Sequence, residues 1–524
     1  MIDNLSQQQR MILAVVLSVL FFVVYDTYFM PKTKLKQELN STKVSTNTSK
    51  TEVKITAPKI KNQPTNVVTS APSTTSKTMV SINSKDFKIY IDEFGRISRY
   101  TLLGEKFKTK DGSYTNVIDD SMKLKPLEVR FSDSSINAEA FTKPYKSDLS
   151  TVDLKDSATI TLTQELTDLT VTKSITFKKD GTYKVDVKLS KPVEFFISNG
   201  EHPVAEESKF VFNGVIVEKS DDTLEKIEDK KADGVLTINN AKYLASNDKY
   251  YTTVFYDFKN GLNVVVSDED EKPMPFVKAN SNITLNGYIG PKSYDKLKAI
   301  DPQLTNVIEY GFFTFIAKPM FSFLKYIYSI IGNWGWTIVI ATILIKLVLF
   351  PLTFKGMVSM NKMKELAPKM QELKEKYKDD KQKLNIKMME LYKKHGANPM
   401  GGCLPMLLQI PIFFAIYRVL LNAFDLKQAS WILWYDDLSV MDPYYVLPLL
   451  MGATMFWQQH ITPTNYTDPM QEKIMKFLPL IFTFFFITFP AGLTLYWFTN
   501  NLFTIAQQYY VNAIFAKQKA SKGK

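Results

Sequence analysis

The chain has 524 residues, a formal net charge of +12 and a single cysteine, Cys403. One cysteine excludes an internal disulfide, and the three histidines lack cysteine or carboxylate partners at ligand spacing, so we expect no metal site. The Gly-x-Ser-x-Gly, Walker and dinucleotide-binding motifs are missing, so we expect no catalytic residues, no cofactor and no enzyme activity. The positive charge is compatible with nucleic-acid binding, but the lysines concentrate beside apolar segments, and we expect no DNA partner.

Residues 1–30 contain an apolar run of ~20 residues, which matches the ~30 Å hydrocarbon core of a bilayer. The run ends in Tyr25-Asp-Thr-Tyr-Phe, without small residues at cleavage spacing, so we expect an N-terminal transmembrane anchor rather than a cleaved signal peptide. Residues 31–80 are rich in Ser, Thr, Lys, Asn and Pro and hold almost no large apolar residues. Such a segment cannot bury enough surface to fold, and we expect a disordered tether.

Residues 81–308 alternate apolar and polar side chains, as in Phe87-Lys-Ile-Tyr-Ile-Asp, which is typical of half-buried strands. Asp180-Gly181 lies between two such runs and predicts a hairpin turn. Many strands with few helical stretches predict a large all-β sandwich. Its aromatic residues either line a ligand groove or form the core of the sandwich, and we favour the core.

Residues 332–354 are expected to form the second transmembrane helix, and they include one lysine, Lys346. A charge at mid-helix costs roughly 2.5 to 3.5 kcal/mol on insertion scales, so it survives where it faces water, a counter-charge or a substrate. We therefore favour a polar cavity around Lys346 over the alternative that its stem snorkels to the interface. The preceding residues, 309–331, have one polar stripe of lysines and serines and are expected to form an interfacial amphipathic helix.

Residues 355–398 are strongly basic, with twelve lysines against six acidic residues between 355 and 394. The positive-inside rule places such a loop in the cytoplasm. Apolar residues recur at spacings of three and four before and after Asp379-Asp380, which predicts an antiparallel helical hairpin. Methionines dominate this apolar stripe, and they either offer a soft surface to apolar clients or hold the two helices together. We favour the second use.

Residues 399–511 contain transmembrane helices 3–6, expected at about 404–421, 443–459, 474–490 and 492–511. The anchor and the Lys346 helix bring the total to six transmembrane helices. The loop 422–442 holds one lysine against four aspartates and is expected outside the cytoplasm. The basic tail, 512–524, is expected in the cytoplasm, where it meets anionic lipid or ribosomal RNA. Both termini are therefore expected to be cytoplasmic.

Polar side chains recur around the lysine. Thr342 lies one turn before Lys346, and Gln409 is a further candidate for the same lining. The last helix carries a polar stripe at intervals of four, formed by Tyr496, Asn500, Thr504 and Gln508. In lipid such a stripe is either a cavity wall or a helix-helix contact. A cationic, hydrated recess can draw a polar client segment into the bilayer without ATP, while the attached apolar helix partitions into lipid.

Two other classes of protein remain open. A secondary transporter or channel would use Lys346 as its substrate or proton site, but it predicts duplicated, Gly- or Pro-broken helices, and no such duplication is seen. A membrane-tethered sugar-processing enzyme would carry its site in the β-sandwich. There, His202 beside Glu201 is the candidate pair.

The membrane region carries several distinctive motifs. They are Asn398-Pro-Met-Gly-Gly-Cys403-Leu-Pro-Met-Leu-Leu-Gln-Ile-Pro411, Asp436-Asp-Leu-Ser-Val-Met-Asp-Pro-Tyr-Tyr, Met451-Gly-Ala-Thr-Met and Thr467-Asp-Pro-Met-Gln. Over about 310–515 the chain closely resembles the YidC membrane-protein insertases, in the form found in bacteria with two membranes. The resemblance implies a five-helix core with a hydrophilic groove closed to the outside, and a cytoplasmic hairpin that receives clients. It also implies a periplasmic supersandwich domain similar to sugar mutarotases.

The resemblance further implies site residues and partners. Family members contact a client helix at positions that match Thr342 and Trp497, the second of which is often tyrosine. The groove's positive charge is usually an arginine five residues before the proline that is Pro351 here, whereas this chain has Lys346, which can lose its proton as arginine cannot. The implied partners are nascent membrane-protein clients, the Sec translocon and the ribosome, and the implied location is the inner membrane.

Overall fold

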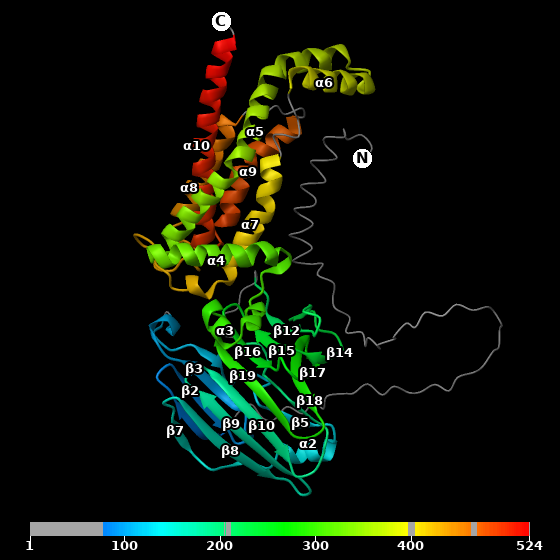
Figure 1. Ribbon diagram of the computed structural model, residues 1–524, viewed down its shortest axis with the longest axis vertical. Helices are drawn as coiled ribbons and strands as arrows, with labels where there is room; N and C mark the ends of the chain where they lie inside the picture. Colours follow the sequence, from blue (N-terminus) through cyan, green and yellow to red (C-terminus); the bar gives the residue numbers. More distant parts are fainter. Residues whose placement is uncertain are drawn as a thin grey trace, which may run out of the picture. The chain divides into compact units, whose positions relative to one another are not determined.

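The computed structural model of the chain describes residues 77–109, 111–203, 205, 211–396, 404–462 and 469–522 (Figure 1). It divides into two compact units, Met1–Val307 and Ile308–Lys524. In the described residues the first unit is rich in strands and the second is helical. The anchor expected at 1–30 lies outside the described residues. The same holds for the tether expected at 31–80 except for its last residues, which already belong to the first strand.

The largest sheet of the first unit has nine strands in the order β13-β12-β15-β16-β19-β10-β9-β8-β6. Its strands are β6 (Lys146–Ser147), β8 (Ser157–Glu165), β9 (Thr170–Lys178), β10 (Thr182–Leu189), β12 (Gly214–Glu218), β13 (Leu224–Glu228), β15 (Tyr243–Asn247), β16 (Tyr251–Tyr256) and β19 (Ile283–Pro291). All neighbouring strands in this sheet are antiparallel, so short hairpins connect many of them.

Two five-stranded sheets complete the unit. One has the order β4-β3-β2-β1-β7 and consists of β1 (Thr78–Asn83), β2 (Phe87–Asp92), β3 (Ile97–Leu102), β4 (Asn116–Ile118) and β7 (Thr151–Asp153). The other has the order β14-β17-β18-β11-β5 and consists of β5 (Val129–Phe131), β11 (Phe195–Ile197), β14 (Val235–Ala241), β17 (Leu262–Glu269) and β18 (Lys272–Ala279). Two short helices, α2 (Ser134–Ala140) and α3 (Tyr294–Ile300), make the unit β-rich rather than all-β.

The β9–β10 hairpin shows how the sequence sets the register of the large sheet. Its turn is Asp180-Gly181, which confirms the prediction from the alternating runs, and Tyr183 pairs with Phe177 across it. Gly181 has a φ of +87°, which side chains with a Cβ rarely adopt. Asp180 Oδ1 accepts the backbone N–H of Thr182 at 2.9 Å and fixes the turn.

One strand residue of this sheet is an unexpected buried amine. Lys173 is fully buried, and its Nζ donates to the carbonyl oxygens of Leu127 at 2.9 Å and Gly95 at 3.1 Å. The amine also lies 4.5 Å from the centre of the Tyr145 ring. Burial lowers the pKa of Lys173 to about 7. The two carbonyl acceptors compensate for the loss of water around this group.

The second unit consists of helices α4 (Thr314–Ile331), α5 (Trp334–Lys376), α6 (Lys381–His395), α7 (Leu404–Asn422), α8 (Val446–Ile461), α9 (Pro469–Phe486) and α10 (Ala491–Lys522). Helix α5 runs for 43 residues through Pro351 and Pro368, so the boundary expected between 354 and 355 lies inside one helix. Helix α10 continues to Lys522, and most of the tail expected at 512–524 is therefore helical.

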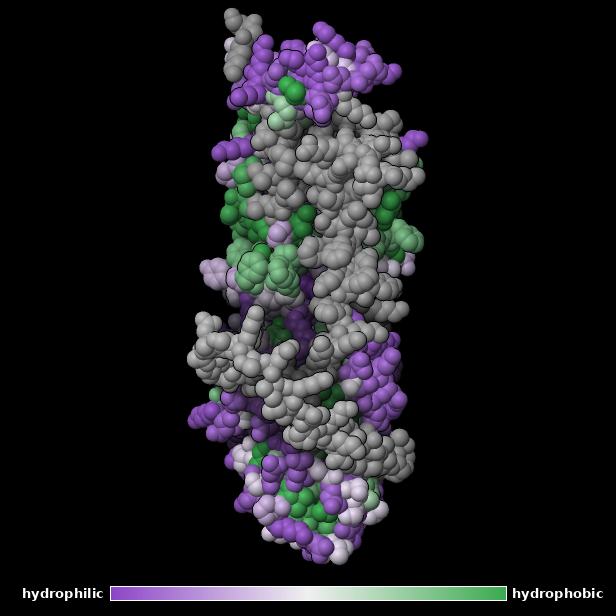
Figure 2. Space-filling view, turned by 90° about the vertical axis from the view of Figure 1, so that its right-hand side faces the viewer, coloured by the Kyte–Doolittle hydropathy of each residue, from purple (hydrophilic) through white to green (hydrophobic). Residues whose placement is uncertain are grey.

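One helix of this unit, α5, is long and strongly apolar in its first half. Within the described ranges, Trp334–Lys376 is the one helix both long and apolar enough to cross a membrane by length and composition, and Gln409–Asn422 is a shorter apolar helix. Figure 2 shows hydrophobic residues along the helices where grey atoms leave them visible, and hydrophilic residues at the end that carries α6.

The C-terminal part of α5 packs against α6. Leu366, Met370 and Tyr392 form a buried cluster, and Met363, Met388 and Leu391 pack around it. Methionines of this region therefore hold the two helices together. On the other side of α6, Ile386 and Met389 remain 58% and 64% exposed.

Helices α8 and α9 approach closely at Gly452. A Cβ at this position would overlap Thr483 Oγ1 of α9, so glycine permits the contact. Thr483 Oγ1 donates to the Pro479 carbonyl oxygen at 2.7 Å, which limits its freedom to move away. The small residue therefore sets the spacing of this helix pair.

We expect Gly452→Ala to lower the free energy of unfolding by about 1 to 3 kcal/mol, the usual cost of overpacking. The double variant Gly452→Ala/Thr483→Ala should recover much of the loss, because it removes the atoms that the new methyl group meets. Thermal unfolding in detergent measures both, with Leu449→Ala on the exposed face of α8 as the control. An unchanged melting temperature for Gly452→Ala would contradict the close contact.

Candidate functional site

Helix α5 carries the lysine of the candidate site. The side chain of Asn333 caps its N-terminus by accepting the backbone N–H of Trp336 at 3.1 Å. Buried polar side chains in the following apolar run include Thr342, Lys346 and Thr353. Spacings of four and seven place them on one face of the helix, where they meet other helices.

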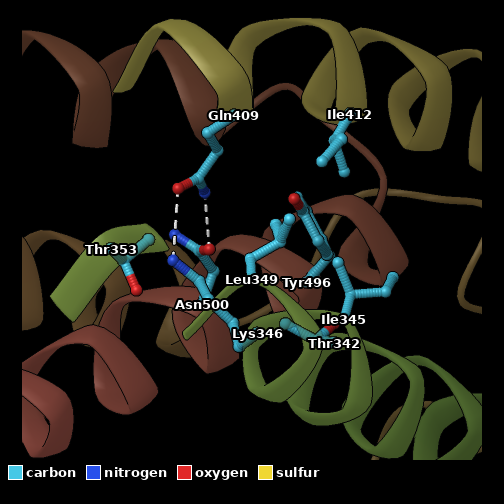
Figure 3. Close-up of a pocket in the computed structure, with 9 residues that line it drawn as sticks. All are labelled: Thr342, Ile345, Lys346, Leu349, Thr353, Gln409, Ile412, Tyr496 and Asn500. Atoms are coloured by element: carbon cyan, nitrogen blue, oxygen red, sulfur yellow. Dashed lines mark hydrogen bonds between the residues drawn. The ribbon is translucent and has the colours of Figure 1, made fainter. Parts of the chain in front are cut away.

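The amine of Lys346 has neutral acceptors on two other helices. Its Nζ donates to Gln409 Oε1 of α7 at 3.1 Å (Figure 3) and to Thr504 Oγ1 of α10 at 3.0 Å. Gln409 Nε2 in turn donates to Asn500 Oδ1 of α10 at 2.6 Å. An ammonium group has three N–H donors, so these two bonds leave one for a further acceptor. No carboxylate in the described part of the chain pairs with this amine.

A cavity lies beside this network, between α5, α7 and α10 (Figure 3). Its lining consists of Thr342, Ile345, Lys346, Leu349, Thr353, Gln409, Ile412, Tyr496 and Asn500. Lys346 is only 7% exposed, and its amine ends between α5, α7 and α10. The cavity combines a hydrogen-bond donor with apolar walls.

The polar stripe of α10 was expected to be either a cavity wall or a helix-helix contact, and its residues differ in this respect. Tyr496 and Asn500 line the cavity, and Thr504 accepts a hydrogen bond from the lysine. Gln508 instead donates to Asn512 Oδ1 at 2.8 Å, and the same oxygen accepts from Asn361 Nδ2 of α5 at 2.9 Å. The stripe is therefore a cavity wall at one end and a helix-helix contact at the other.

Trp497 lies next to the cavity and outside its lining. Its ring meets Phe413 of α7 edge-on, with 4.6 Å between ring centres. It also lies 5.7 Å from the Phe482 ring and 5.3 Å from the Phe486 ring of α9. Trp497 therefore joins α7, α9 and α10 in one aromatic contact.

Four lining residues were not singled out from the sequence. Thr353 had a usable signal, because its spacing of seven from Lys346 places it on the same helical face. Ile345, Leu349 and Ile412 had none, since an apolar side chain that lines a cavity looks the same in sequence as one that faces lipid.

The chain matches two family models: the YidC periplasmic domain over residues 95–323 and the 60Kd inner membrane protein over residues 326–519. A Campylobacter jejuni subsp. jejuni protein named membrane protein insertase YidC is 51% identical over 523 residues, which cover 99% of this chain and 98% of that protein. Proteins of the same name from Wolinella succinogenes and Helicobacter pylori are 49% identical over 527 residues and 44% identical over 544 residues. These cover 100% and 99% of this chain, and 98% of each relative.

A β-rich unit is followed by a helical unit whose helix α5 is long and apolar enough to cross a membrane. The two matched regions together extend over most of the chain. The chain belongs to the YidC family. It is an inner-membrane protein, and its β-rich unit is the periplasmic domain of that family.

The β-rich unit holds the other candidate pair, His202 and Glu201, and their side chains have separate partners. Glu201 Oε1 accepts the backbone N–H of Lys123. His202 Nε2 lies 2.6 Å from Asp229 Oδ2, and its Nδ1 lies 2.9 Å from the Pro203 carbonyl oxygen. An acceptor at each ring nitrogen favours the doubly protonated imidazolium. The structure therefore pairs His202 with Asp229, for which the sequence carried no local signal, rather than with Glu201.

The His202–Asp229 pair makes folding stability depend on pH. Burial lowers the pKa of His202, but the hydrogen bond and charge of Asp229 outweigh it, so the pKa is raised above its ordinary value of about 6.5. A raised folded-state pKa stabilises the fold fully below about pH 6.5, and this contribution is lost as pH rises through the raised pKa.

We expect the backbone amides of β12 and β13 to exchange faster with rising pH, beyond the intrinsic pH effect, as His202 loses its proton. Asp229→Asn should abolish this excess, because it removes the charge while keeping the shape. Hydrogen exchange on the full chain measures it, with the exposed Asp221→Asn as the control. The same excess in wild type and Asp229→Asn would contradict the pairing.

Proposed function

We propose that this chain inserts membrane proteins into the inner membrane and helps them fold, with the Lys346 cavity as the groove that receives polar client segments. The observation that carries the proposal is an amine held by neutral acceptors, with a donor to spare, beside apolar walls. The relatives in its family are named membrane protein insertases, which supports the same function.

The chemistry of the groove suits an acidic or polar client segment. In its protonated form Lys346 can donate its remaining N–H to a client carboxylate, and such charge-assisted hydrogen bonds are about twice as strong as neutral ones. The low polarity of the helical bundle strengthens the attraction further. The apolar part of the client then enters lipid, and its transfer from water, roughly 25 cal/mol per Å² of apolar surface, drives insertion without nucleotide hydrolysis.

We propose six transmembrane helices, with both termini in the cytoplasm. The spans are the anchor within residues 1–30, the first half of α5, and helices α7 to α10. Helix α4 would lie in the outer interface, because one of its faces packs against the unit and another exposes apolar side chains. Phe321 and Leu324 are buried against the unit, whereas Tyr326 and Ile330 are 67% and 70% exposed and would contact lipid.

On the cytoplasmic side we propose that the α5–α6 hairpin receives clients and that the basic end of α10 meets the ribosome and anionic lipids. The Lys519 side chain there is 72% exposed even though its amine pairs with Glu365 at 2.8 Å. Cooperation with the Sec translocon, implied by the family resemblance, belongs to the same proposal. The chain would work both alone and beside the translocon.

We expect the charge at position 346 to decide insertion. In liposomes that contain the purified chain, Lys346→Arg should insert a short single-span client with an acidic external tail about as well as wild type. Lys346→Ala and Lys346→Glu should insert it several-fold more slowly, because the first removes the donor and the second repels the tail. Protease protection of the tail measures insertion.

A client with a neutral tail serves as the control for this series, since its insertion should depend much less on position 346. Equal insertion of the acidic client by all four proteins would contradict a role for the Lys346 charge. The transporter alternative predicts instead that the chain carries an ion or solute flux that Lys346→Ala stops, with client insertion unaffected.

A further inference from the structure

Helix α7 supplies Gln409, which accepts a hydrogen bond from Lys346. One face of α7 packs against α10. Gln409 and Phe413 are four residues apart and therefore share a face. Gln409 bonds Asn500 at 2.6 Å, and the Phe413 ring lies edge-on to Trp497 at 4.6 Å between centres. The position of α7 relative to α10 thus decides whether Gln409 reaches its partners.

A second face of α7 is held by the segment that precedes α4. Phe414 and Arg418, also four residues apart, share this face. Arg418 Nη1 lies 3.8 Å from Glu309 Oε2, and the two side chains are 15% and 5% exposed. The Phe414 ring stacks on Phe313, with 5.8 Å between centres and 9° between planes. Helix α7 is therefore held on one side by α10 and on another by the start of α4.

The carboxylate of this ion pair is itself fixed in place. Glu309 Oε1 accepts the backbone N–H of Gly311 at 2.6 Å. Gly311 has a φ of +72°, which turns the chain between Glu309 and Phe313 so that both contact α7. A Cβ at Gly311 would lie 3.5 Å from Arg418 Nε. The turn, the ion pair and the ring stack form one arrangement.

We propose that Glu309 and Arg418 are positioning residues of the insertion groove: their ion pair fixes α7 against the start of α4, so that Gln409 reaches Lys346 and Asn500. This inference rests on the proposed function of the Lys346 cavity. Neither residue touches the cavity, and both act through the placement of α7.

The physical reason is that this ion pair ties α7 to the segment before α4. Loss of Glu309 would remove that tie, and a shift of α7 toward water would lower the cost of desolvating the Arg418 side chain, which is 15% exposed. Position 409 lies nine residues from 418, about 13.5 Å along α7, which continues through Pro411, so a shift of the whole helix would also move Gln409. A displacement of ~1 Å is enough to break hydrogen bonds of ordinary length.

The test is a charge swap in the full chain. Arg418→Glu and Glu309→Arg should each slow insertion of the acidic-tail client several-fold in liposomes. The double variant Glu309→Arg/Arg418→Glu should restore most of the rate, because the pair is rebuilt with its charges exchanged. The matched control is the same swap at the exposed Lys146–Glu165 pair of the β-rich unit, which should leave insertion unchanged.

A second measurement separates positioning from a general loss of stability. Spin labels at positions 410 of α7 and 502 of α10 report the distance between the two helices in folded protein. We expect this distance to increase or broaden in each single variant and to return in the double variant. Single variants that insert like wild type, a double variant without rescue, or slower insertion with an unchanged distance would each overturn the proposal.

The outcomes also distinguish this inference from the proposed function. If Lys346→Ala inserts clients as well as wild type, the proposed function fails, and the label distance still tests whether the pair positions α7. If Lys346→Ala is defective while Arg418→Glu and Glu309→Arg are normal, the inference fails and the proposed function stands.

Discussion

An ammonium group inside an apolar helical bundle needs hydrogen-bond acceptors, and Lys346 obtains them from two different helices. Gln409 on α7 and Thr504 on α10 have to converge on α5 for this to happen. Gln507 Nε2 adds a bond from α10 to the Lys346 carbonyl oxygen at 3.4 Å. The arrangement of the three helices, and the cavity between them, therefore depends on the hydrogen bonds of the Lys346 side chain.

Buried charges in this chain differ in whether an opposite charge lies beside them. In the β-rich unit Arg96 pairs with Asp92 at 2.8 Å and with Glu128 at 3.1 Å, and both carboxylates are fully buried. Arg130 also pairs with Glu128 at 2.8 Å, so each carboxylate of this network has a positive partner. Within the described residues the Lys346 amine bonds only neutral acceptors, Gln409 and Thr504.

Much of the fold was readable because it depends on local patterns. Asp180-Gly181 specified its hairpin, and helical spacing brought Thr342 and Lys346 to one buried face. Other features depend on partners far away in sequence. The burial of Lys173 requires two carbonyl groups from other segments, and the partner of His202 is Asp229, 27 residues on.

Helices α5 and α10 each have a feature that their sequences do not predict. Proline usually ends a helix, yet α5 continues through Pro351. The α10 stripe has a regular spacing of four, but spacing alone cannot tell that Gln508 bonds Asn512 while Asn500 lines the cavity. Partner helices, and not periodicity, decide what each polar residue does.

The most direct test of the account is a zero-length cross-link between the client and the groove. A carbodiimide joins a carboxylate to a primary amine only where the two touch, so a client arrested during insertion should be joined through its acidic residue to Lys346, as mass spectrometry of the peptides would show. Lys346→Arg should insert the client but give no such product, since a guanidinium does not form the amide. Normal arrest without any product at Lys346, while other lysines of the chain react, would contradict the account.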